Sequence, residues 1–219
     1  MSINRYIKKI LDARVYDVAI ESPITHAELL SKRFNNQIYL KREDLQPVFS
    51  FKLRGAYNRA RQLTSEQRSK GIIAASAGNH QKLGIEATIV MPTTTPEIKV
   101  NSVRAKGAHV VLVGDAFDEA SAYALQQVDE KGLIYIPPYD DEDVIAGQGT
   151  VAMEILMQFT APLTAVFIPV GGGGLIAGMA AYIKFVRPEI KIIGVEPEDA
   201  ACLKAALAAD ERVILDEVG

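Results

Sequence analysis

A lysine at the start of a predicted helix is the residue of this sequence best suited to do chemistry. Lys52 lies in the stretch SFKLRG (residues 50–55), after a strand predicted to end near Asp44. A helix N-terminus favours anions, so a lysine there is unusual, and its apolar neighbours Phe51 and Leu53 predict surroundings of low polarity. Such surroundings lower the pKa of a lysine, and the neutral amine can then attack a carbonyl carbon. A solvated surface lysine remains the alternative, because lysine is rarely buried.

A run of glycines is the second feature with chemical potential. Gly171, Gly172, Gly173 and Gly174 follow an apolar strand, and a helix begins at Leu175. Glycine lets the backbone approach a ligand closely, and the helix N-terminus adds a positive partial charge. Because a tight turn needs only one or two glycines, we interpret the run as a phosphate cradle. Its spacing matches neither the dinucleotide fingerprint nor the nucleotide triphosphate loop, so a small phosphate ester is expected.

The third feature is the short motif SAGNH at residues 76–80, which follows a predicted strand. Small residues at a strand end leave backbone N–H groups exposed, and these suit a carboxylate. Asn79 also fits a helix cap. His80 is interpreted as a structural or substrate-contacting residue.

Together, the three motifs resemble those of the fold-type II pyridoxal-phosphate enzymes, the tryptophan synthase beta-like family, and within them the biosynthetic threonine dehydratase (threonine ammonia-lyase) branch. The similarity runs from about Val15 to Gly219. It implies that Lys52 carries pyridoxal 5'-phosphate as a Schiff base. It also implies that the cofactor contacts Phe51, Asn79, Gly171, Gly172, Gly173, Gly174 and Leu175. The implied substrate-binding residues are Ser76, Ala77, Gly78 and His80.

The reaction implied by this resemblance is the dehydration and deamination of L-threonine to 2-oxobutanoate and ammonia, the first step of isoleucine biosynthesis. Lys52 would remove the α-proton while the cofactor ring takes up the negative charge. In similar serine racemases a serine stands at the position of Ala77, so elimination with little racemisation is expected. A serine racemase or serine dehydratase of the same fold remains an alternative. A non-catalytic phosphate-ligand-binding domain and a βαβ nucleotide enzyme are alternatives from other classes.

Composition and charge limit the classes of binding partner that this protein can have. The chain has 219 residues, 48% of them hydrophobic and 23% charged, and a net charge of −3, which offers no basic field for nucleic acid. With neither a signal peptide nor a membrane-spanning apolar run in view, we expect a cytoplasmic protein without a membrane partner. Cys202 is the only cysteine, which fits a reducing compartment. The resemblance implies a homo-oligomer, a dimer or tetramer, that acts on a small amino acid.

The elements that must position these residues alternate between strand and helix, which predicts an α/β fold of parallel sheets covered by helices. Helices are predicted over residues 3–20, 26–33, 52–63, 96–106, 115–130, 142–158, 175–186 and 199–208. Strands are predicted over 38–43, 71–75, 86–91, 109–113, 133–136, 164–170 and 190–196. The resemblance implies a large domain, residues 1–53 and 150–219, truncated at its C-terminus, and an inserted small three-layer domain, residues 54–149.

Three further expectations come from comparing this chain with the family pattern. Parallel strands at 71–75 and 86–91 need a crossover of about a dozen residues or more, usually helical, so about eight residues are expected to be missing between His80 and Gln81. The family loop that contacts the pyridine nitrogen would lie beyond Gly219, so these 219 residues alone are expected to be a poor catalyst that can lack the cofactor. Glu196 matches a metal ligand of similar serine racemases, but Cys202 replaces the partner aspartate, so no structural metal is expected.

Overall fold

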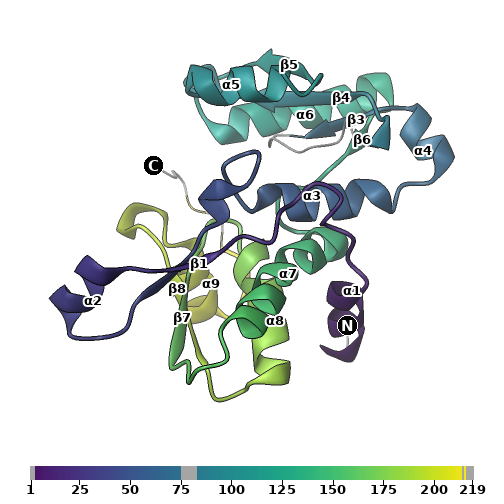
Figure 1. Ribbon diagram of the computed structural model, residues 1–219. Coiled ribbons are helices and arrows are strands. Elements are labelled where there is room, and N and C mark those ends of the chain that lie inside the picture. The colour runs from purple at the N-terminus through teal and green to yellow at the C-terminus, as the bar shows by residue number, and fades with distance from the viewer. Residues whose placement is uncertain (1–2, 75–82, 214, 216–219) are drawn as a thin grey trace.

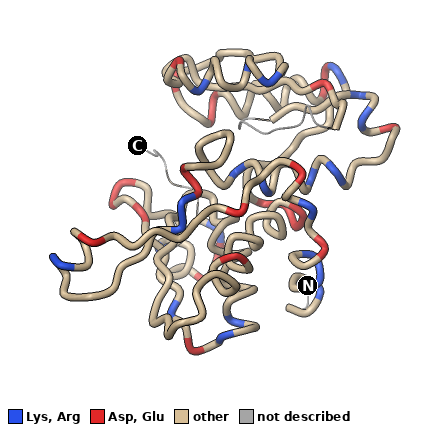
Figure 2. The backbone as a smooth tube through the Cα atoms, in the orientation of Figure 1, with Lys and Arg blue, Asp and Glu red and all other residues tan. Residues whose placement is uncertain are grey.

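The computed structural model describes residues 3–74, 83–213 and 215. Among these residues, no helix is both long enough and apolar enough to cross a membrane. Basic and acidic residues are both scattered over the described backbone (Figure 2). The motif at 76–80 lies outside the described residues. The roles assigned above to Ser76, Ala77, Gly78, Asn79 and His80 therefore stay predictions.

A four-stranded parallel sheet forms the upper part of the molecule in Figure 1. Its strands, in spatial order, are β5 (His109–Leu112), β4 (Ala87–Met91), β3 (Ile72–Ala74) and β6 (Ile134–Tyr135). Alternate residues of a strand point to opposite faces. Ile72 accordingly packs with residues of α5 (Glu97–Arg104) and α3 (Lys52–Arg61), whereas Ile73 packs against α6 (Phe117–Lys131). The result is a three-layer unit with two apolar cores.

The lower part of the molecule is built on a second, smaller sheet. The parallel strands β7 (Ala165–Pro169) and β8 (Lys191–Val195) share an apolar cluster with helices α7 (Glu142–Gln158) and α8 (Gly174–Val186). Helix α1 (Ile3–Leu11) contacts both of these helices, and η3 (Glu198–Ala200) leads into α9 (Cys202–Ala209). The expected α/β fold with parallel sheets covered by helices is confirmed.

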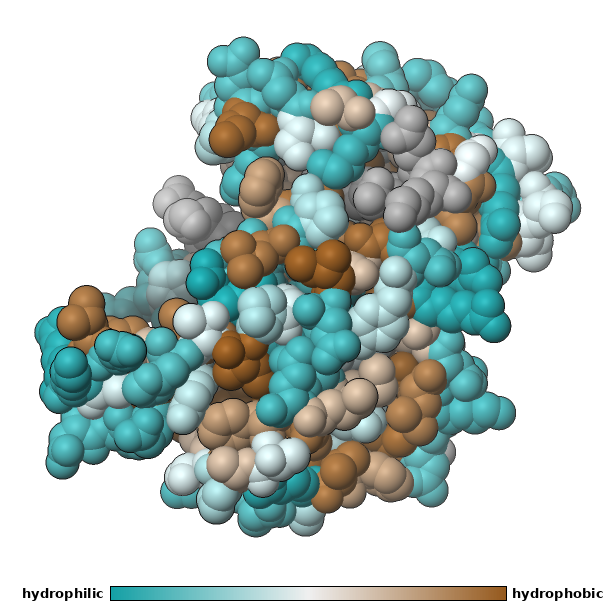
Figure 3. Space-filling model, viewed as in Figure 1, coloured by the Kyte–Doolittle hydropathy of each residue, from teal (hydrophilic) through white to brown (hydrophobic). Residues whose placement is uncertain are grey.

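An antiparallel pair near the N-terminus projects to the left in Figure 1. It consists of β1 (Ile24–His26) and β2 (Tyr39–Lys41), with α2 (Glu28–Phe34) between them. The short helix η1 (Glu43–Leu45) then leads to α3, and α4 (Ser65–Ser69) follows. The space-filling view shows polar and apolar residues intermixed on this face (Figure 3).

Three predictions near the N-terminus are wrong in detail. The helix predicted over residues 3–20 ends at Leu11, because Val15 and Val18 pack instead against α3. Strand β1 is absent from the predicted strands, and the helix predicted from residue 26 begins only at Glu28. Pairing with β2 holds Ile24–His26 in an extended conformation. Such pairing with a distant strand overrides the local turn signal of a serine and a proline.

The predicted neighbours β3 and β4 are parallel, with Ile72 opposite Ala87. Only residues 75–86 connect them, and His80 and Gln81 are consecutive in the sequence. These twelve residues are at the lower limit for a parallel crossover, which usually contains a helix. That a helix of about eight residues has been lost there stays a prediction.

Close backbone contacts between glycines join α3, α7 and α8. A methyl group built on Gly147 of α7 would lie 2.6 Å from the Cα atom of Gly55 and 2.7 Å from the carbonyl oxygen of Arg54, both in α3. A methyl group on Gly178 of α8 would come closer than 3.0 Å to the backbone of α7. The absence of side chains at these positions therefore sets how closely the lysine helix, α7 and α8 approach one another.

Replacing Gly147 with alanine is expected to destabilise the protein by about 2 kcal/mol, because the clash is with backbone atoms that no side-chain rotation can relieve. Alanine has a higher helix propensity than glycine, by about 1 kcal/mol, and this alone would stabilise the helix. A net loss of stability would therefore be due to the steric clash. Chemical denaturation measures the difference. Gly194→Ala is the control, because its methyl group would meet only side-chain ends at 3.2 Å. Equal stability of the two variants would contradict the close contact.

Candidate active site

Lys52 is the first residue of α3. Its apolar neighbours predicted surroundings of low polarity, but the side chain is exposed. The pKa of Lys52 is nevertheless lowered from its ordinary value of 10.5. The larger cause is loss of hydration, and the positive charge of Lys99 is the second. A group can remain in contact with solvent while protein atoms surround it on several sides, and this accounts for both observations. A lowered pKa makes more neutral amine available at a given pH.

The residue before the lysine connects it to the glycine run. Phe51 packs against an apolar cluster that contains Leu175 and Ile168. Ile168 lies in β7, immediately before the glycines, and Leu175 lies in the first turn of α8, immediately after them. The structure therefore places the N-terminal end of α3 beside the apolar residues that flank the glycine run.

The glycine run has the geometry of an anion-binding loop. Gly173 precedes α8 with φ 85° and offers no side chain to cap the helix. The first N–H groups of a helix have no partner within it, so they can bind an anion. Among the described residues, a methyl group built on Gly171 or Gly173 would meet no atom within 4 Å. This open side can receive a phosphate group. Together with a lysine of lowered pKa, it fits an aldehyde cofactor that carries a phosphate.

A fully buried arginine that the motif analysis did not single out anchors the lysine helix. Arg54 is 0% exposed and uses all five of its N–H donors. Its Nε and one terminal nitrogen each donate to Glu43 at 2.8 Å. The remaining bonds reach the Ile20 carbonyl oxygen, the Thr150 hydroxyl group and the Glu154 carboxylate. Arg54 thereby joins α3 to α7, η1 and the segment before β1.

The second carboxylate of this cluster is held from two sides. Glu154 is 1% exposed and also forms an ion pair with Lys41 of β2 at 2.6 Å. Two cations and two anions therefore balance within the cluster. The sequence offered no signal for it, because its members are far apart in the chain: Arg54 and Glu154 are separated by 100 positions.

The acidic stretch after β8 has a structural role. Glu196 accepts hydrogen bonds from the backbone N–H groups of Leu203 at 2.8 Å and Lys204 at 3.0 Å, and so caps α9. Burial opposes ionisation of Glu196, but these bonds outweigh it and lower its pKa. The thiol of Cys202 donates to the Gly171 carbonyl oxygen at 3.3 Å, which joins α9 to the glycine run. Within the described part of the chain, no three potential metal-ligating side chains cluster.

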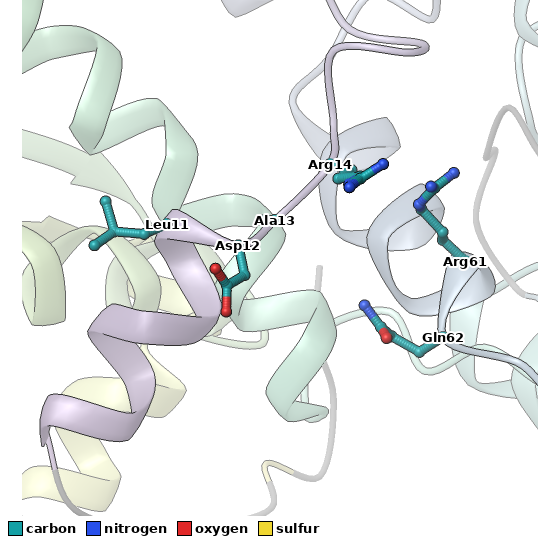
Figure 4. Close-up of a pocket in the computed structure, with 6 residues that line it drawn as sticks. All are labelled: Leu11, Asp12, Ala13, Arg14, Arg61 and Gln62. Carbon is teal, nitrogen blue, oxygen red and sulfur yellow. The ribbon is translucent and has the colours of Figure 1, made fainter.

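A separate hollow of about 570 Å³ lies at the other end of the lysine helix (Figure 4). Arg61 and Gln62 from the end of α3 line it, together with residues 11–14. A ten-residue helix is about 15 Å long, so this hollow lies well away from Lys52. It contains none of the residues that the motifs identified.

Comparison with known proteins gives a consistent result. Residues 15–218 match the family model described as "Pyridoxal-phosphate dependent enzyme". The chain is 59% identical over 222 residues to threonine dehydratase biosynthetic, chloroplastic, from Arabidopsis thaliana, and the match covers 98% of this chain and 38% of that protein. The chain therefore spans well under half the length of this curated relative. The alignment is longer than the chain itself, so the relative has residues within the aligned region that this chain lacks.

Solved structures agree with the sequence comparison. The processed form of threonine deaminase isoform 2 from Solanum lycopersicum superimposes with a TM-score of 0.92 at 53% identity, covering 99% of this chain and 62% of that chain. Maize serine racemase superimposes with a TM-score of 0.88 at 30% identity, covering 97% of this chain and 68% of that chain.

Proposed function

This chain belongs to the pyridoxal-phosphate dependent enzymes, and we propose that it carries the lysine and the phosphate-binding loop of a threonine ammonia-lyase. The reaction removes water from L-threonine, and hydrolysis of the product releases ammonia and leaves 2-oxobutanoate. The observation that carries the proposal is the lowered pKa of Lys52, together with the packing of Phe51 against the apolar cluster that contains Leu175, beside the glycine run. The 59% identity to the threonine dehydratase from Arabidopsis thaliana supports threonine as the substrate.

The roles of this chain's own residues follow from their placement. The amine of Lys52 attaches the cofactor and, once released, accepts the α-proton of the substrate. The backbone N–H groups at the start of α8 and the open side of Gly171 and Gly173 hold the phosphate. When bound, pyridoxal phosphate takes up the electron pair that the α-carbon keeps after losing its proton. Arg54 holds the first turn of α3 in place, so the amine stays aligned with the loop.

The domain organisation is part of the proposal. Residues 54–149 are assigned to a small inserted domain, and residues 1–53 and 150–219 to a larger one. The two apolar cores on either side of the four-stranded sheet support a separate small unit. We also propose a homo-oligomer, a dimer or tetramer, that resides in the cytoplasm and takes a small amino acid as substrate.

Incubation of the protein with pyridoxal phosphate and L-threonine is expected to release 2-oxobutanoate and ammonia, with slower release from L-serine. Formation of D-serine, measured by chiral chromatography, is expected to be much slower than ammonia release. The reason is that Ala77 has no proton to donate to the opposite face of the α-carbon. Ala77→Ser is the matched variant and is expected to raise D-serine formation. Comparable rates of racemisation and ammonia release in the unmodified protein would favour a serine racemase instead.

A further inference from the structure

Tyr139, in the connection between β6 and α7, lies directly on the glycine run. A methyl group built on Gly172 would come closer than 3.0 Å to three ring atoms of Tyr139, Cγ, Cδ1 and Cε1. One built on Gly174 would lie 2.9 Å from the Tyr139 carbonyl oxygen and 3.1 Å from its Cα atom. The ring therefore covers Gly172, and the backbone of the same residue covers Gly174.

These contacts explain separately why a glycine occupies three of the four positions. Gly172 and Gly174 lack side chains because Tyr139 occupies the space, and Gly173 adopts φ 85°, a conformation that other residues rarely adopt. Gly171 has neither a clash nor a positive φ. The number of glycines in the run therefore does not by itself indicate phosphate binding. One side of the loop is packed by Tyr139, while no atom of the described residues fills the space beside Gly171 and Gly173.

Tyr139 is itself held by the sheet unit and by α7. Two residues after it, the N–H group of Asp141 donates to its carbonyl oxygen at 3.1 Å. The side chain of Asp141 caps α7 by accepting from the N–H groups of Asp143 and Val144. Three residues before it, Ile136 donates from its N–H group to Ile73 in β3. The glycine run therefore rests on a residue whose position depends on the four-stranded sheet.

We propose that Tyr139 is a positioning residue that shapes the phosphate-binding loop. Its ring supports Gly172 from one side, so the loop presents Gly171, Gly173 and the N-terminus of α8 to the ligand on the other. The identity of the ligand rests on the proposed function, but the contact between Tyr139 and Gly172 does not. The proposal also makes the hydroxyl group of Tyr139 dispensable, since the atoms of Tyr139 nearest to Gly172 and Gly174 are ring carbons, the Cβ atom and backbone atoms.

The test measures Gly172→Ala in two backgrounds, the unmodified protein and Tyr139→Gly. In the unmodified protein the new methyl group must displace the ring. The variant is expected to lower the Tm by roughly 2–4 °C or more and to weaken pyridoxal phosphate binding by about ten-fold. In the Tyr139→Gly background the space is empty, so adding Gly172→Ala should change neither the Tm nor the affinity appreciably. If Tyr139→Gly does not fold, Tyr139→Ala also removes the ring and allows the same comparison.

Two further variants separate positioning from other roles. Tyr139→Phe keeps the ring and is expected to bind pyridoxal phosphate as the unmodified protein does, whereas Tyr139→Gly is expected to bind about ten-fold more weakly. Gly171→Ala should weaken binding without changing the Tm, with or without Tyr139. Equal damage from Gly172→Ala in both backgrounds, or full affinity in Tyr139→Gly, would overturn the proposal. Absence of pyridoxal phosphate binding in every variant, with the Tm pattern intact, would instead reject the proposed function alone.

Discussion

Replacing Lys52 with alanine is expected to abolish both the covalent attachment of pyridoxal phosphate and the turnover of L-threonine, while the protein stays folded. The side chain of Lys52 is exposed, so its removal leaves no buried cavity. Alanine is a strong helix former, and loss of a positive charge at a helix N-terminus is favourable. The expected result is thus a stable but inactive protein.

Borohydride trapping tests the attachment. The protein is incubated with pyridoxal phosphate, reduced and digested, and mass spectrometry identifies the lysine that carries the label. The label is expected on Lys52 in the unmodified protein and is expected to be absent in Lys52→Ala. Lys106→Ala is a matched control, because burial also lowers the pKa of Lys106, which lies at the end of α5. Label on another lysine, or unchanged turnover in Lys52→Ala, would contradict the assignment.

The pH dependence of labelling gives a second readout from the same residue. Only the neutral amine attacks an aldehyde, so the rate should rise with pH and level off above the pKa of Lys52. Because loss of hydration, and to a smaller extent the charge of Lys99, lowers this pKa, the midpoint should lie below 10.5. Lys99→Ala removes the second cause and should move the midpoint upward. A midpoint at 10.5 in both proteins would mean that Lys52 is an ordinary solvated lysine.

Replacing Arg54 with alanine is expected to lower the free energy of unfolding by about 3–5 kcal/mol, because the buried pair with Glu154 is broken and the partly buried Glu43 carboxylate loses its cationic partner. Arg54→Lys should retain little of this stability, since a lysine cannot reproduce the five hydrogen bonds of the planar guanidinium group. The exposed pair of Arg42 with Asp44 supplies the control, and Arg42→Ala should have little effect on stability. Chemical denaturation measures all three variants.

A double variant separates the lost charge from the lost packing. In Arg54→Met with Glu43→Gln, no carboxylate is left unpaired at position 43, and the glutamine can keep its bonds to Ser22 and Gln46. Its destabilisation should therefore be smaller than the sum of the two single variants. Simple additivity would show that the ion pair contributes nothing specific.

The same cluster predicts how stability depends on pH. Burial raises the pKa of Glu43, but its hydrogen bonds and the charge of Arg54 outweigh this and lower the pKa below its ordinary value of 4.5. A carboxyl group with a lowered folded-state pKa stabilises the protein above its unfolded-state pKa, and the effect is lost as the pH falls through the folded-state value. The unmodified protein should lose this contribution below about pH 4.5. Arg54→Ala should lose less stability over the same range.

Local patterns in the sequence determined the type and order of most elements. The alternation of apolar strands and amphipathic helices predicted a parallel α/β fold, and the helix over residues 142–158 begins and ends where it was predicted. The motif around Lys52 and the glycine run each marked the correct turn between a loop and a helix. These features depend on residues close together in the chain, which is why periodicity and punctuation were sufficient.

Tertiary structure alone decided which distant residues meet, because such contacts leave no periodic trace in a single sequence. Nothing near Arg54 indicates that its partner is Glu154 in α7, and nothing in the four glycines indicates that Tyr139 fills the space beside two of them. Strand β1 was missed for the same reason, since pairing with β2 keeps it extended. The exposure of Lys52 also followed from the arrangement of surrounding elements, even though its lowered pKa was expected from its neighbours. The candidate reactive residues could therefore be predicted from local sequence. The contacts that hold them in place depend on packing between elements far apart in the chain.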